Sequence, residues 1–381
     1  MKIAVPAEAD EVEPRVAATP ETVKKFVGLG AEVTVAAGAG SRAAVTDAAF
    51  EAAGAAIAKD AATALAGADI VLKVRSPTAA ELKGCKRDAL VIALMDPYGN
   101  EAEVKAMAEA GVAAFAMELM PRISRAQSMD ALSSQANLAG YRAVIEAAEA
   151  YGRALPMMMT AAGTVPAARV FVMGAGVAGL QAIATARRLG AVVTATDVRP
   201  AAKEQVESLG AKFIAVEDEE FRQAETAAGY AKPMSEAYQA KQAALVAEHI
   251  KKQDIVITTA LIPGRPAPRL VSREMVAAMK PGSVIVDLAV ERGGNVAGAE
   301  PGETVTVDGV TIVGYLNLAG RIAASASALY ARNLHAFVAT MIDKDKKSLA
   351  VDWDDELVKA TNLTRGGKVV HPAFARQGDK P

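Results

Sequence analysis

The segment Arg169-Val170-Phe171-Val172-Met173-Gly174-Ala175-Gly176-Val177-Ala178-Gly179 decides the fold of this 381-residue chain. An apolar strand runs directly into the pattern Gly-x-Gly-x-x-Gly, and a helix over Leu180–Leu189 and a strand over Ala191–Thr196 follow. In such a unit the first glycine permits a tight turn, the second lets the backbone approach a pyrophosphate, and the third lets helix and strand pack closely. The helix N-terminus adds unpaired N–H groups that bind phosphate. The segment predicts a dinucleotide-binding α/β domain with these phosphate-binding residues: Gly174, Gly176, Val177 and Gly179.

The second strand of this unit ends in Asp197, which lies 18 residues after Gly179. A carboxylate at that position accepts hydrogen bonds from the adenosine ribose hydroxyls. It also repels a 2′-phosphate, so the sequence favours NAD(H) over NADP(H). Arg199 could instead accept such a phosphate, and that alternative stays open.

Two later strand ends are predicted to complete the nucleotide pocket. They are Thr258-Thr259-Ala260-Leu261-Ile262-Pro263-Gly264 and Asp287-Leu288-Ala289. Ligands of parallel sheets bind at the carboxyl ends of the strands, so we expect Thr259, Ala260 and Leu261 to contact the cofactor. Ordinary strand-to-helix turns are the alternative.

Short β-type segments alternate with alanine-rich helical segments through most of the chain, a pattern typical of parallel α/β proteins. The first helix has Thr19 as its N-cap, Pro20 at its first position and Gly30 beyond its end. The strands we expect, mostly apolar as in sheets covered on both faces, are Lys2–Val5, Ala31–Ala36, Asp69–Val74, Ala89–Met95, Val112–Met117, Arg169–Met173, Ala191–Thr196, Lys212–Val216, Asp254–Thr259 and Ser283–Asp287.

Long helical segments over Met129 to about Gly152 and Gly320 to about Ile342 flank the second series of strands. They predict an α/β fold of two Rossmann-like domains with parallel sheets, joined by long helices across a cleft. The first domain is discontinuous, residues 1–130 plus 325–381, and the nucleotide-binding domain is residues 131–324. The polar segment from Glu217 to about Ser235 has no clear periodicity, and a loop of that length is usually functional or disordered.

Composition excludes several classes of protein. Lys and Arg total 42 against 44 Asp and Glu, so the net charge of −2 argues against a nucleic-acid binder with a basic stripe. A single cysteine and three histidines without ligand-like spacing predict no disulfide framework and no metal site. With neither an apolar run of about 18 residues nor a signal-peptide core, we expect a protein of a reducing compartment without direct membrane insertion.

A polar cluster, Pro121-Arg122-Ile123-Ser124-Arg125-Ala126-Gln127-Ser128-Met129-Asp130, precedes the first long helix. One interpretation is that Ser128 or Asp130 caps that helix and that the arginines are solvated. The other is that the cluster holds the nicotinamide end of the cofactor across the cleft through Arg122, Gln127, Asp130 and Ser133. Ser133 lies three residues beyond Asp130, so both can share one helical face.

This cluster, preceded by Met117-Glu118-Leu119-Met120 and followed by Asn137-Leu138-Ala139-Gly140-Tyr141-Arg142, resembles the NAD(H)-binding component (domain I) of proton-translocating nicotinamide nucleotide transhydrogenase. The resemblance covers nearly the whole chain, including Met157–Thr164, Gly174–Gly179, Ala195–Arg199 and Thr258–Gly264.

The resemblance assigns roles to individual residues. It implies that Arg122, Gln127, Asp130 and Ser133 contact the nicotinamide portion and that Asp197 holds the adenosine ribose, with Val198 and Arg199 beside it. The segment Gly229-Tyr230-Ala231-Lys232 resembles a mobile loop that closes on the nucleotide, so Tyr230 joins the expected cofactor contacts.

The activity that the resemblance implies is Si-face-specific NAD(P)⁺ transhydrogenation coupled to proton translocation. The chain would bind NAD(H) and exchange hydride directly with NADP(H) on a partner subunit, while membrane-spanning subunits move the proton. Direct transfer between two nicotinamides needs orientation and no general acid or base. The resemblance also implies a homodimer that is cytoplasmic and peripheral to the inner membrane through its partners.

A weaker resemblance extends to alanine dehydrogenase. Arg15 and Lys73 match positions that bind the substrate carboxylate in that family. The catalytic histidine expected after the Ala89–Met95 strand is missing, because the chain reads Leu94-Met95-Asp96-Pro97-Tyr98 there. An alanine dehydrogenase-like amino-acid oxidoreductase is therefore the alternative enzyme, and a non-enzymatic NAD sensor is the alternative outside enzymes.

Overall fold

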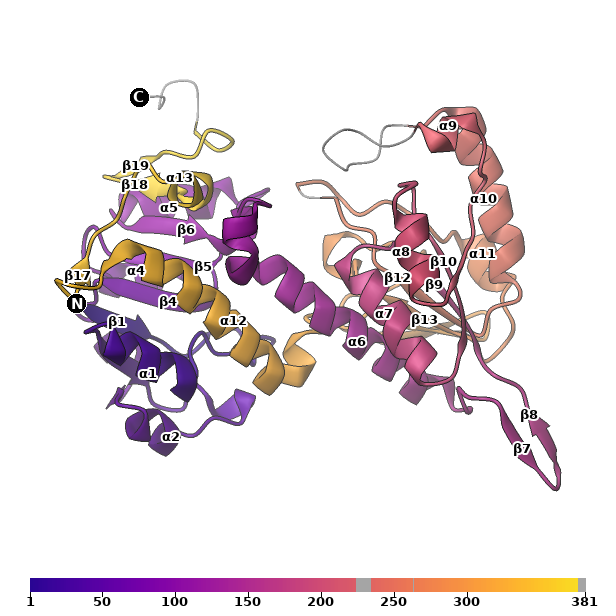
Figure 1. The fold of residues 1–381 in the computed structure, drawn as a ribbon, viewed down its shortest axis with the longest axis horizontal. Coiled ribbons are helices and arrows are strands. Elements are labelled where there is room, and N and C mark those ends of the chain that lie inside the picture. The colour runs from indigo at the N-terminus through magenta and orange to yellow at the C-terminus, as the bar shows by residue number, and fades with distance from the viewer. Residues whose placement is uncertain (224–233, 263, 376–381) are drawn as a thin grey trace. The chain divides into compact units, whose positions relative to one another are not determined.

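A computed structural model describes residues 1–223, 234–262 and 264–375 of the chain, which divides into two compact units. Unit 1 is formed by Met1–Gln135 and the segment from Ala319 onward, and unit 2 by Ala136–Leu318. Each unit has a mainly parallel sheet with helices on both faces (Figure 1). The fold is therefore α/β, as the alternation of apolar strands and alanine-rich helices predicts.

The sheet of unit 1 has the strand order β3-β2-β1-β4-β5-β6, and every pair in it is parallel. Its strands are β1 (Lys2–Val5), β2 (Glu32–Ala36), β3 (Ala56–Ala58), β4 (Ile70–Arg75), β5 (Leu90–Leu94) and β6 (Ala113–Ala116). The order reverses between β1 and β4, which makes the carboxyl ends of these two strands the switch point of the sheet.

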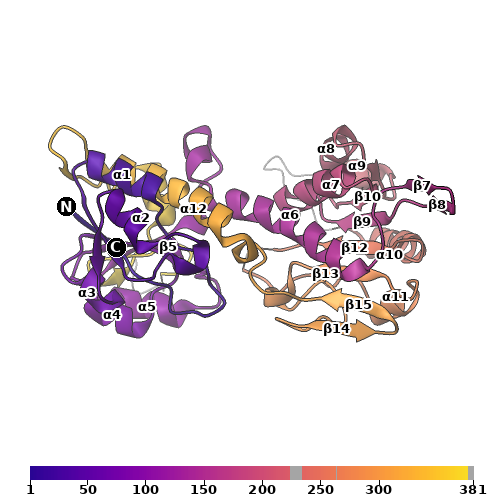
Figure 2. The ribbon, with the colours of Figure 1, turned by 90° about the horizontal axis from the view of Figure 1, so that it is seen from below.

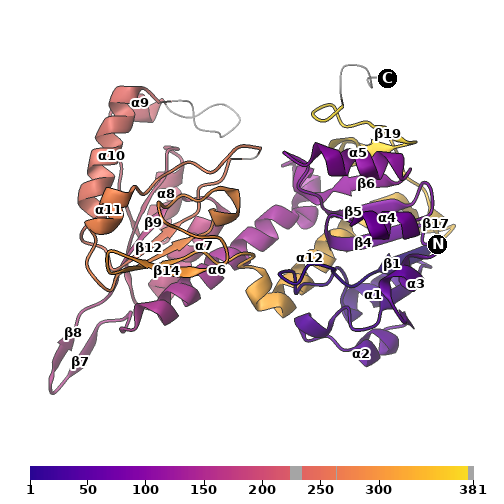
Figure 3. The same cartoon turned by 180° about the vertical axis from the view of Figure 1, so that it is seen from behind.

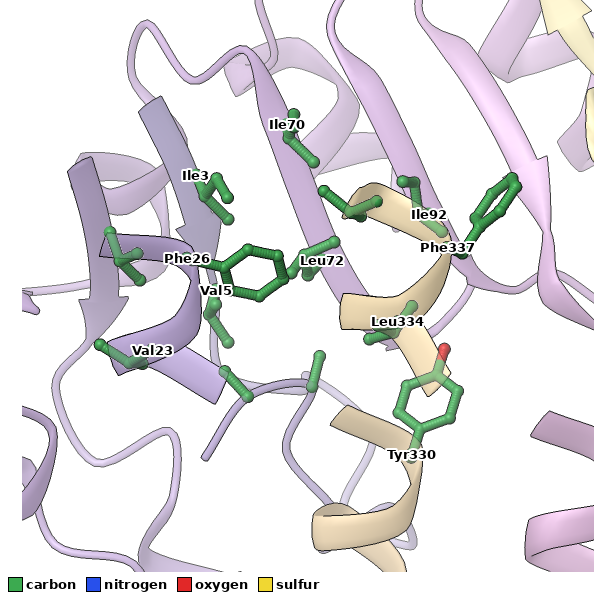
Figure 4. Close-up of a cluster of buried hydrophobic side chains, with 14 of the residues drawn as sticks. Ile3, Val5, Val23, Phe26, Ile70, Leu72, Ile92, Tyr330, Leu334 and Phe337 are labelled. Atoms are coloured by element: carbon green, nitrogen blue, oxygen red, sulfur yellow. The ribbon is translucent and has the colours of Figure 1, made fainter. Parts of the chain in front are cut away.

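Helices α1 (Pro20–Gly28) and α12 (Ala323–Val338) cover one face of this sheet, and α4 (Ala79–Gly84) and α5 (Glu101–Glu109) cover the other (Figure 3). Figure 4 shows the first interface, where Phe26 of α1 and Leu334 and Phe337 of α12 lie against Val5 and Leu72 of the strands. The remaining α-helices of unit 1 outside α6 are α2 (Asp47–Ala52), α3 (Ala61–Leu65) and α13 (Glu356–Thr361).

The sheet of unit 2 has the order β11-β10-β9-β12-β13-β15-β14 and is parallel except for its edge strand β14. Its strands are β9 (Arg169–Met173), β10 (Val192–Thr196), β11 (Lys212–Phe213), β12 (Ile255–Thr258), β13 (Val284–Asp287), β14 (Thr304–Val307) and β15 (Val310–Val313). Asp308 and Gly309 turn β14 into β15 with φ of +52° and +81°. Two successive positive φ values are the geometry of a type I′ hairpin turn.

The helices of unit 2 follow the alternation of side chains along its strands. Val170 and Val172 of β9 face α6 (Ala131–Tyr151), α7 (Val177–Arg188) and α8 (Ala202–Ser208), while Phe171 faces α10 (Glu236–Ile250) and α11 (Arg273–Ala277). Helix α6 approaches α7 at backbone distance, because a Cβ on Gly140 would lie 2.0 Å from the carbonyl oxygen of Ala178. Only glycine fits at position 140.

A two-stranded hairpin, β7 (Met158–Thr160) and β8 (Gly163–Val165), extends from the end of α6 away from the sheet of unit 2 (Figures 1 and 2). All six of its strand residues are exposed. Met157, Met158 and Met159 are 61%, 43% and 80% exposed, so the hairpin presents apolar side chains to solvent.

The structure corrects several element boundaries expected from the sequence. The helix of the glycine-rich unit begins at Val177 rather than at Leu180. The second long helix is α12, flanked by 3₁₀ turns at Gly320–Ile322 and Ala339–Met341. The segment expected to be a loop from Glu217 begins with the short helix α9 (Glu219–Arg222). Strands β3, β14 and β15 and the hairpin β7–β8 are additions to the elements expected from the sequence.

Candidate functional site

The glycine-rich turn of unit 2 lies at the carboxyl end of β9, where the strand order reverses between β9 and β12. Gly174 has φ +105°, and a Cβ on Gly179 would lie 1.8 Å from the carbonyl oxygen of Gly174. Around Gly176, in contrast, no atom lies within 4 Å of the Cβ position. The turn is therefore tight where helix and strand meet and open where a pyrophosphate would approach, which fits a dinucleotide.

Helix α7 starts at this turn without a side-chain cap on Gly176. Its first backbone N–H groups therefore have no capping side chain, and the positive end of the helix dipole faces the turn. Val177, the first residue of the helix, is 41% exposed. These features form an anion site at the N-terminus of a helix of 12 residues.

Asp197 and Arg199 form an ion pair at the end of β10. The Nε and Nη2 atoms of Arg199 donate to the two carboxylate oxygens of Asp197 at 2.9 and 3.1 Å, and Ala175 N donates to Oδ2 at 2.7 Å. Arg199 Nη2 also lies 3.3 Å from the carbonyl oxygen of Ala175. The carboxylate is thereby fixed against the glycine-rich turn, and the guanidinium is bonded to the carboxylate. Val198, between them, is half exposed.

The turn after β12 contacts the glycine-rich turn. Thr259 N donates to the carbonyl oxygen of Met173 at 2.9 Å, and the Thr259 hydroxyl donates to that of Gly174 at 3.1 Å. Ala260 follows, and Leu261 is 53% exposed. The structure thus brings Thr259 beside the predicted phosphate-binding residues.

Asp287, which the sequence places at the pocket, is fully buried instead. Its Oδ1 accepts hydrogen bonds from Ala289 N and the Thr258 hydroxyl at 2.9 and 3.2 Å, and its Oδ2 accepts one from Val296 N at 3.0 Å. Burial raises the pKa of the Asp287 carboxyl above its ordinary value, and these hydrogen bonds oppose that shift. Its side chain therefore organises neighbouring loops and does not line the pocket.

The polar cluster of unit 1 forms the 3₁₀ turn Ser124–Met129 before α6. Arg122 and Gln127 are exposed, and Arg125 forms a bidentate ion pair with Asp355 at 2.6 and 3.1 Å. Asp130 Oδ1 accepts a hydrogen bond from Ser133 N at 2.8 Å, the geometry of a helix N-cap. The capping interpretation of Asp130 is therefore confirmed, and it leaves a nucleotide contact by the same carboxylate open.

The four residues expected at the nicotinamide, Arg122, Gln127, Asp130 and Ser133, all belong to unit 1. The residues expected at the phosphates and ribose belong to unit 2. The structure brings each set together within its own unit. Tyr230 and the rest of the expected loop Gly229–Lys232 lie outside the described residues, as does Pro263.

Arg15 and Lys73, the residues matched to a substrate-carboxylate site, are 4% and 1% exposed. Arg15 donates to both carboxylate oxygens of Glu13 at 2.6 Å, and Lys73 Nζ lies 2.6 Å from Glu81 and 3.3 Å from Glu8. Each cation is thus already paired with a carboxylate of the chain. The sequence interpretation missed these glutamates, although Glu8 and Glu13 lie within a few residues of Arg15.

Glu118, just after β6, has an unusual environment. Its Oε1 accepts a hydrogen bond from Asp96 N, whereas its Oε2 is buried without a hydrogen-bond partner. Burial is the largest cause that raises the pKa of Glu118 from 4.5 to about 7, and the charge of Asp96 adds to it. A carboxyl group of this kind is protonated over part of the physiological pH range.

Within residues 1–223, 234–262 and 264–375, no group of three or more His, Cys, Asp or Glu side chains is arranged to hold a metal ion. No helix of the same residues is both long and apolar enough to cross a bilayer.

Known proteins share this chain's sequence and fold. The family description "Alanine dehydrogenase/PNT, N-terminal domain" matches residues 4–139, and "Alanine dehydrogenase/PNT, C-terminal domain" matches residues 143–372. The chain is 58% identical over 383 aligned positions to an NAD(P) transhydrogenase alpha subunit of Rhodospirillum rubrum, covering 99% of this chain and 100% of the relative.

Solved structures agree with this. A transhydrogenase from Sinorhizobium meliloti is 64% identical with a TM-score of 0.89, covering 97% of this chain and 100% of the other. An L-alanine dehydrogenase is 25% identical with a TM-score of 0.81 and 98% coverage of both chains. Family and fold together support the binding of a nicotinamide nucleotide. The chain belongs to the alanine dehydrogenase/PNT family, and its high identity to NAD(P) transhydrogenase alpha subunits places it with them, at a greater distance from alanine dehydrogenase.

Proposed function

We propose that this chain is the NAD(H)-binding subunit of a proton-translocating, Si-face-specific NAD(P)⁺ transhydrogenase. The observation that carries the proposal is the arrangement in unit 2, where Asp197 is hydrogen-bonded to Ala175 N inside the Gly174–Gly179 turn. That arrangement offers backbone N–H groups for a pyrophosphate and a carboxylate for ribose hydroxyls in one place. The identity to transhydrogenase alpha subunits supports the reaction.

In this proposal the bound nicotinamide supplies the hydride chemistry, and the residues of the chain orient it. The N-terminus of α7 binds the pyrophosphate, Asp197 the adenosine ribose, and the exposed turn Thr259–Leu261 lines the same edge of the sheet. Arg122 and Gln127, which are exposed beside the N-cap of α6, contact the nicotinamide portion together with Asp130 and Ser133. One nucleotide thus uses residues of both units, and Tyr230 belongs to a loop that excludes water.

Hydride passes directly between this nucleotide and NADP(H) on a partner subunit. The reaction needs the two ring carbons held about 3–3.5 Å apart, and no proton leaves a hydroxyl or amine group. The proposal therefore assigns no general acid or base and no metal. Asp96 stands where alanine dehydrogenases have a catalytic histidine, which supports a reaction without acid–base catalysis.

The proposed partners follow from the subunit names of the relatives and from the resemblance. They are a second copy of this chain, an NADP(H)-binding subunit and membrane-spanning subunits that translocate protons, with no nucleic acid. The exposed methionines of the β7–β8 hairpin are the first apolar surface to examine for homodimer contacts. The proposed location is the cytoplasmic face of the inner membrane, through these partners.

The experiment that tests the proposal mixes this purified chain with a purified NADP(H)-binding transhydrogenase component and follows NADPH-dependent reduction of an NAD⁺ analogue. Transfer that requires both proteins supports the proposal. Sustained alanine-dependent formation of NADH by this chain alone would instead establish the alternative, an alanine dehydrogenase-like oxidoreductase. Binding of NADH without transfer to any partner would indicate an NAD sensor.

A further inference from the structure

Asn295, a residue without a predicted role, makes three hydrogen bonds to backbone groups in the interior of unit 2. Its side chain is fully buried. Oδ1 accepts a hydrogen bond from Ala260 N at 3.0 Å, and Nδ2 donates to the carbonyl oxygens of Ala260 and Pro268 at 2.9 and 2.8 Å. Both backbone polar groups of Ala260 are therefore bonded to one side chain, which fixes the orientation of that residue.

The turn that contains Ala260 has little else to hold its distal part. Leu261 and Ile262, which follow Ala260, are 53% and 46% exposed, so their side chains do not anchor the turn in the core. On the other side, Thr259 donates to the carbonyl oxygens of Met173 and Gly174. The bonds from Asn295 therefore determine where this turn continues beyond Thr259.

The contact between Thr259 and the glycine-rich turn is tight. A Cβ on Gly174 would lie 2.5 Å from Thr259 Oγ1 and 3.5 Å from Ala260 N. A shift of Ala260 toward β9 is thus resisted by backbone, and a shift away breaks the Thr259 bond. The position of the Ala260 backbone and the position of the Gly174 peptide are coupled.

Asn295 is itself held in place. The backbone carbonyl oxygen of Asn295 accepts hydrogen bonds from Leu270 N and Val271 N at 2.8 and 3.0 Å, and Asp287 Oδ2 accepts one from the next residue, Val296 N. The side chain thus projects from a fixed segment, so its amide provides a rigid reference for the turn.

From these contacts we propose that Asn295 is a positioning residue for nucleotide binding, which acts through Ala260 and Thr259 on the turn that begins at Gly174. The inference rests on the nucleotide site proposed above. It predicts that loss of the Asn295 amide weakens NADH binding, although the side chain is buried and makes no contact with solvent.

The test compares Asn295→Ala with Gln253→Ala, measuring NADH dissociation constants by fluorescence at a temperature where circular dichroism shows each protein folded. Gln253 is a matched control, because this residue is 3% exposed in the same unit and its Nε2 donates to the backbone carbonyl of His249, on helix α10. Both substitutions should lower the melting temperature. Only Asn295→Ala should raise the NADH dissociation constant, by about tenfold.

Each outcome decides a separate question. If the unsubstituted chain binds no NADH, the proposed function fails. If it binds NADH and Asn295→Ala binds equally well, or Gln253→Ala weakens binding as much, the positioning role is wrong while the proposed function stands. If Asn295→Ala does not fold, Thr259→Val and Thr259→Ser decide: weaker binding in the first and near-normal binding in the second support the role, and equal binding in both contradicts it.

Discussion

The hydroxyl of Ser133 donates a 2.6 Å hydrogen bond to Oδ2 of Asp130, while Oδ1 of Asp130 accepts the backbone N–H of Ser133. One carboxylate thus receives both the hydroxyl and the amide of the residue three positions later. This pair makes the first turn of α6 rigid, and it also presents a fixed negative charge beside the exposed Gln127. Structural and binding roles therefore coincide at Asp130, and substitutions can separate them.

Asp130→Asn should keep the cap and impair the reaction. Asparagine caps helices about as well as aspartate, so the melting temperature should stay close to that of the unsubstituted protein, whereas Asp130→Ala should lower stability by about 1 kcal/mol. If the carboxylate orients the nicotinamide, both variants should slow hydride transfer in the mixed assay. A normal rate for Asp130→Asn would show that Asp130 is only a cap.

Gln127→Asn should slow hydride transfer more than it weakens NADH binding. The shortened side chain displaces the amide by one methylene, and small errors in the approach of the two rings reduce the rate strongly. Stopped-flow transfer rates and equilibrium NADH titrations measure the two effects. Arg125→Gln is the control, because Arg125 lies in the same turn but is bonded to Asp355. An unchanged rate for Gln127→Asn would remove Gln127 from the site.

Asp197→Ala should lose NADH affinity by about tenfold, which corresponds to about 1.4 kcal/mol for lost charged hydrogen bonds. The same substitution removes the carboxylate that holds Arg199, so NADPH affinity should stay constant or rise. Fluorescence titrations with both nucleotides give the ratio of the two affinities. Equal NADH affinity in the substituted and unsubstituted proteins would mean that Asp197 is structural.

Gly179→Ala and Gly176→Ala should fail in different ways. A methyl group at position 179 would meet the Gly174 carbonyl oxygen at 1.8 Å, so about 3 kcal/mol of stability should be lost in thermal unfolding. At position 176 the methyl group meets nothing within 4 Å and φ is −76°, so the protein should fold normally. Because that space is where a pyrophosphate approaches, Gly176→Ala should weaken NADH binding. Normal binding by Gly176→Ala would contradict the phosphate site.

Glu118 should make unit 1 less stable as the pH rises. The folded pKa of about 7 lies above the ordinary value of 4.5, so the full contribution to stability is present below pH 4.5 and is lost as the pH rises to 7. The difference amounts to about 3 kcal/mol. Glu118→Gln should flatten the dependence of unfolding free energy on pH between 5 and 7 in denaturant titrations, whereas the exposed Glu103→Gln should not. An equal slope in Glu118→Gln and the unsubstituted protein would contradict this assignment.

Those elements whose signals are local could be predicted from the sequence. Strands β1 and β9 have the boundaries expected, because each is an apolar run that ends directly at a turn or glycine. The first helix follows Thr19, whose side chain accepts the Thr22 N–H as an N-cap should. Strand β3, Ala-Ile-Ala, could not be recognised because alanine carries no preference for a strand.

The hairpin β14–β15 was missed although its signal is present. Asp308-Gly309 between two alternating apolar runs is a strong hairpin pattern. The buried partners of Arg15, Lys73 and Ala260 could not be predicted in the same way. The sequence separations of the contacts Lys73–Glu8 and Ala260–Asn295 are set by the order of the strands, which local patterns do not encode.

The glycine at position 140 has a mechanical consequence. Helix α6 presses its own backbone against the carbonyl of Ala178, the second residue of α7, with no side chain between them to deform. Strain applied along this 21-residue helix is therefore delivered to the α7 amides almost undamped. A spacer of even one methyl group would turn this stiff contact into a compliant one, so the smallest residue in the chain sets how faithfully the phosphate site follows the movement of the helix beside it.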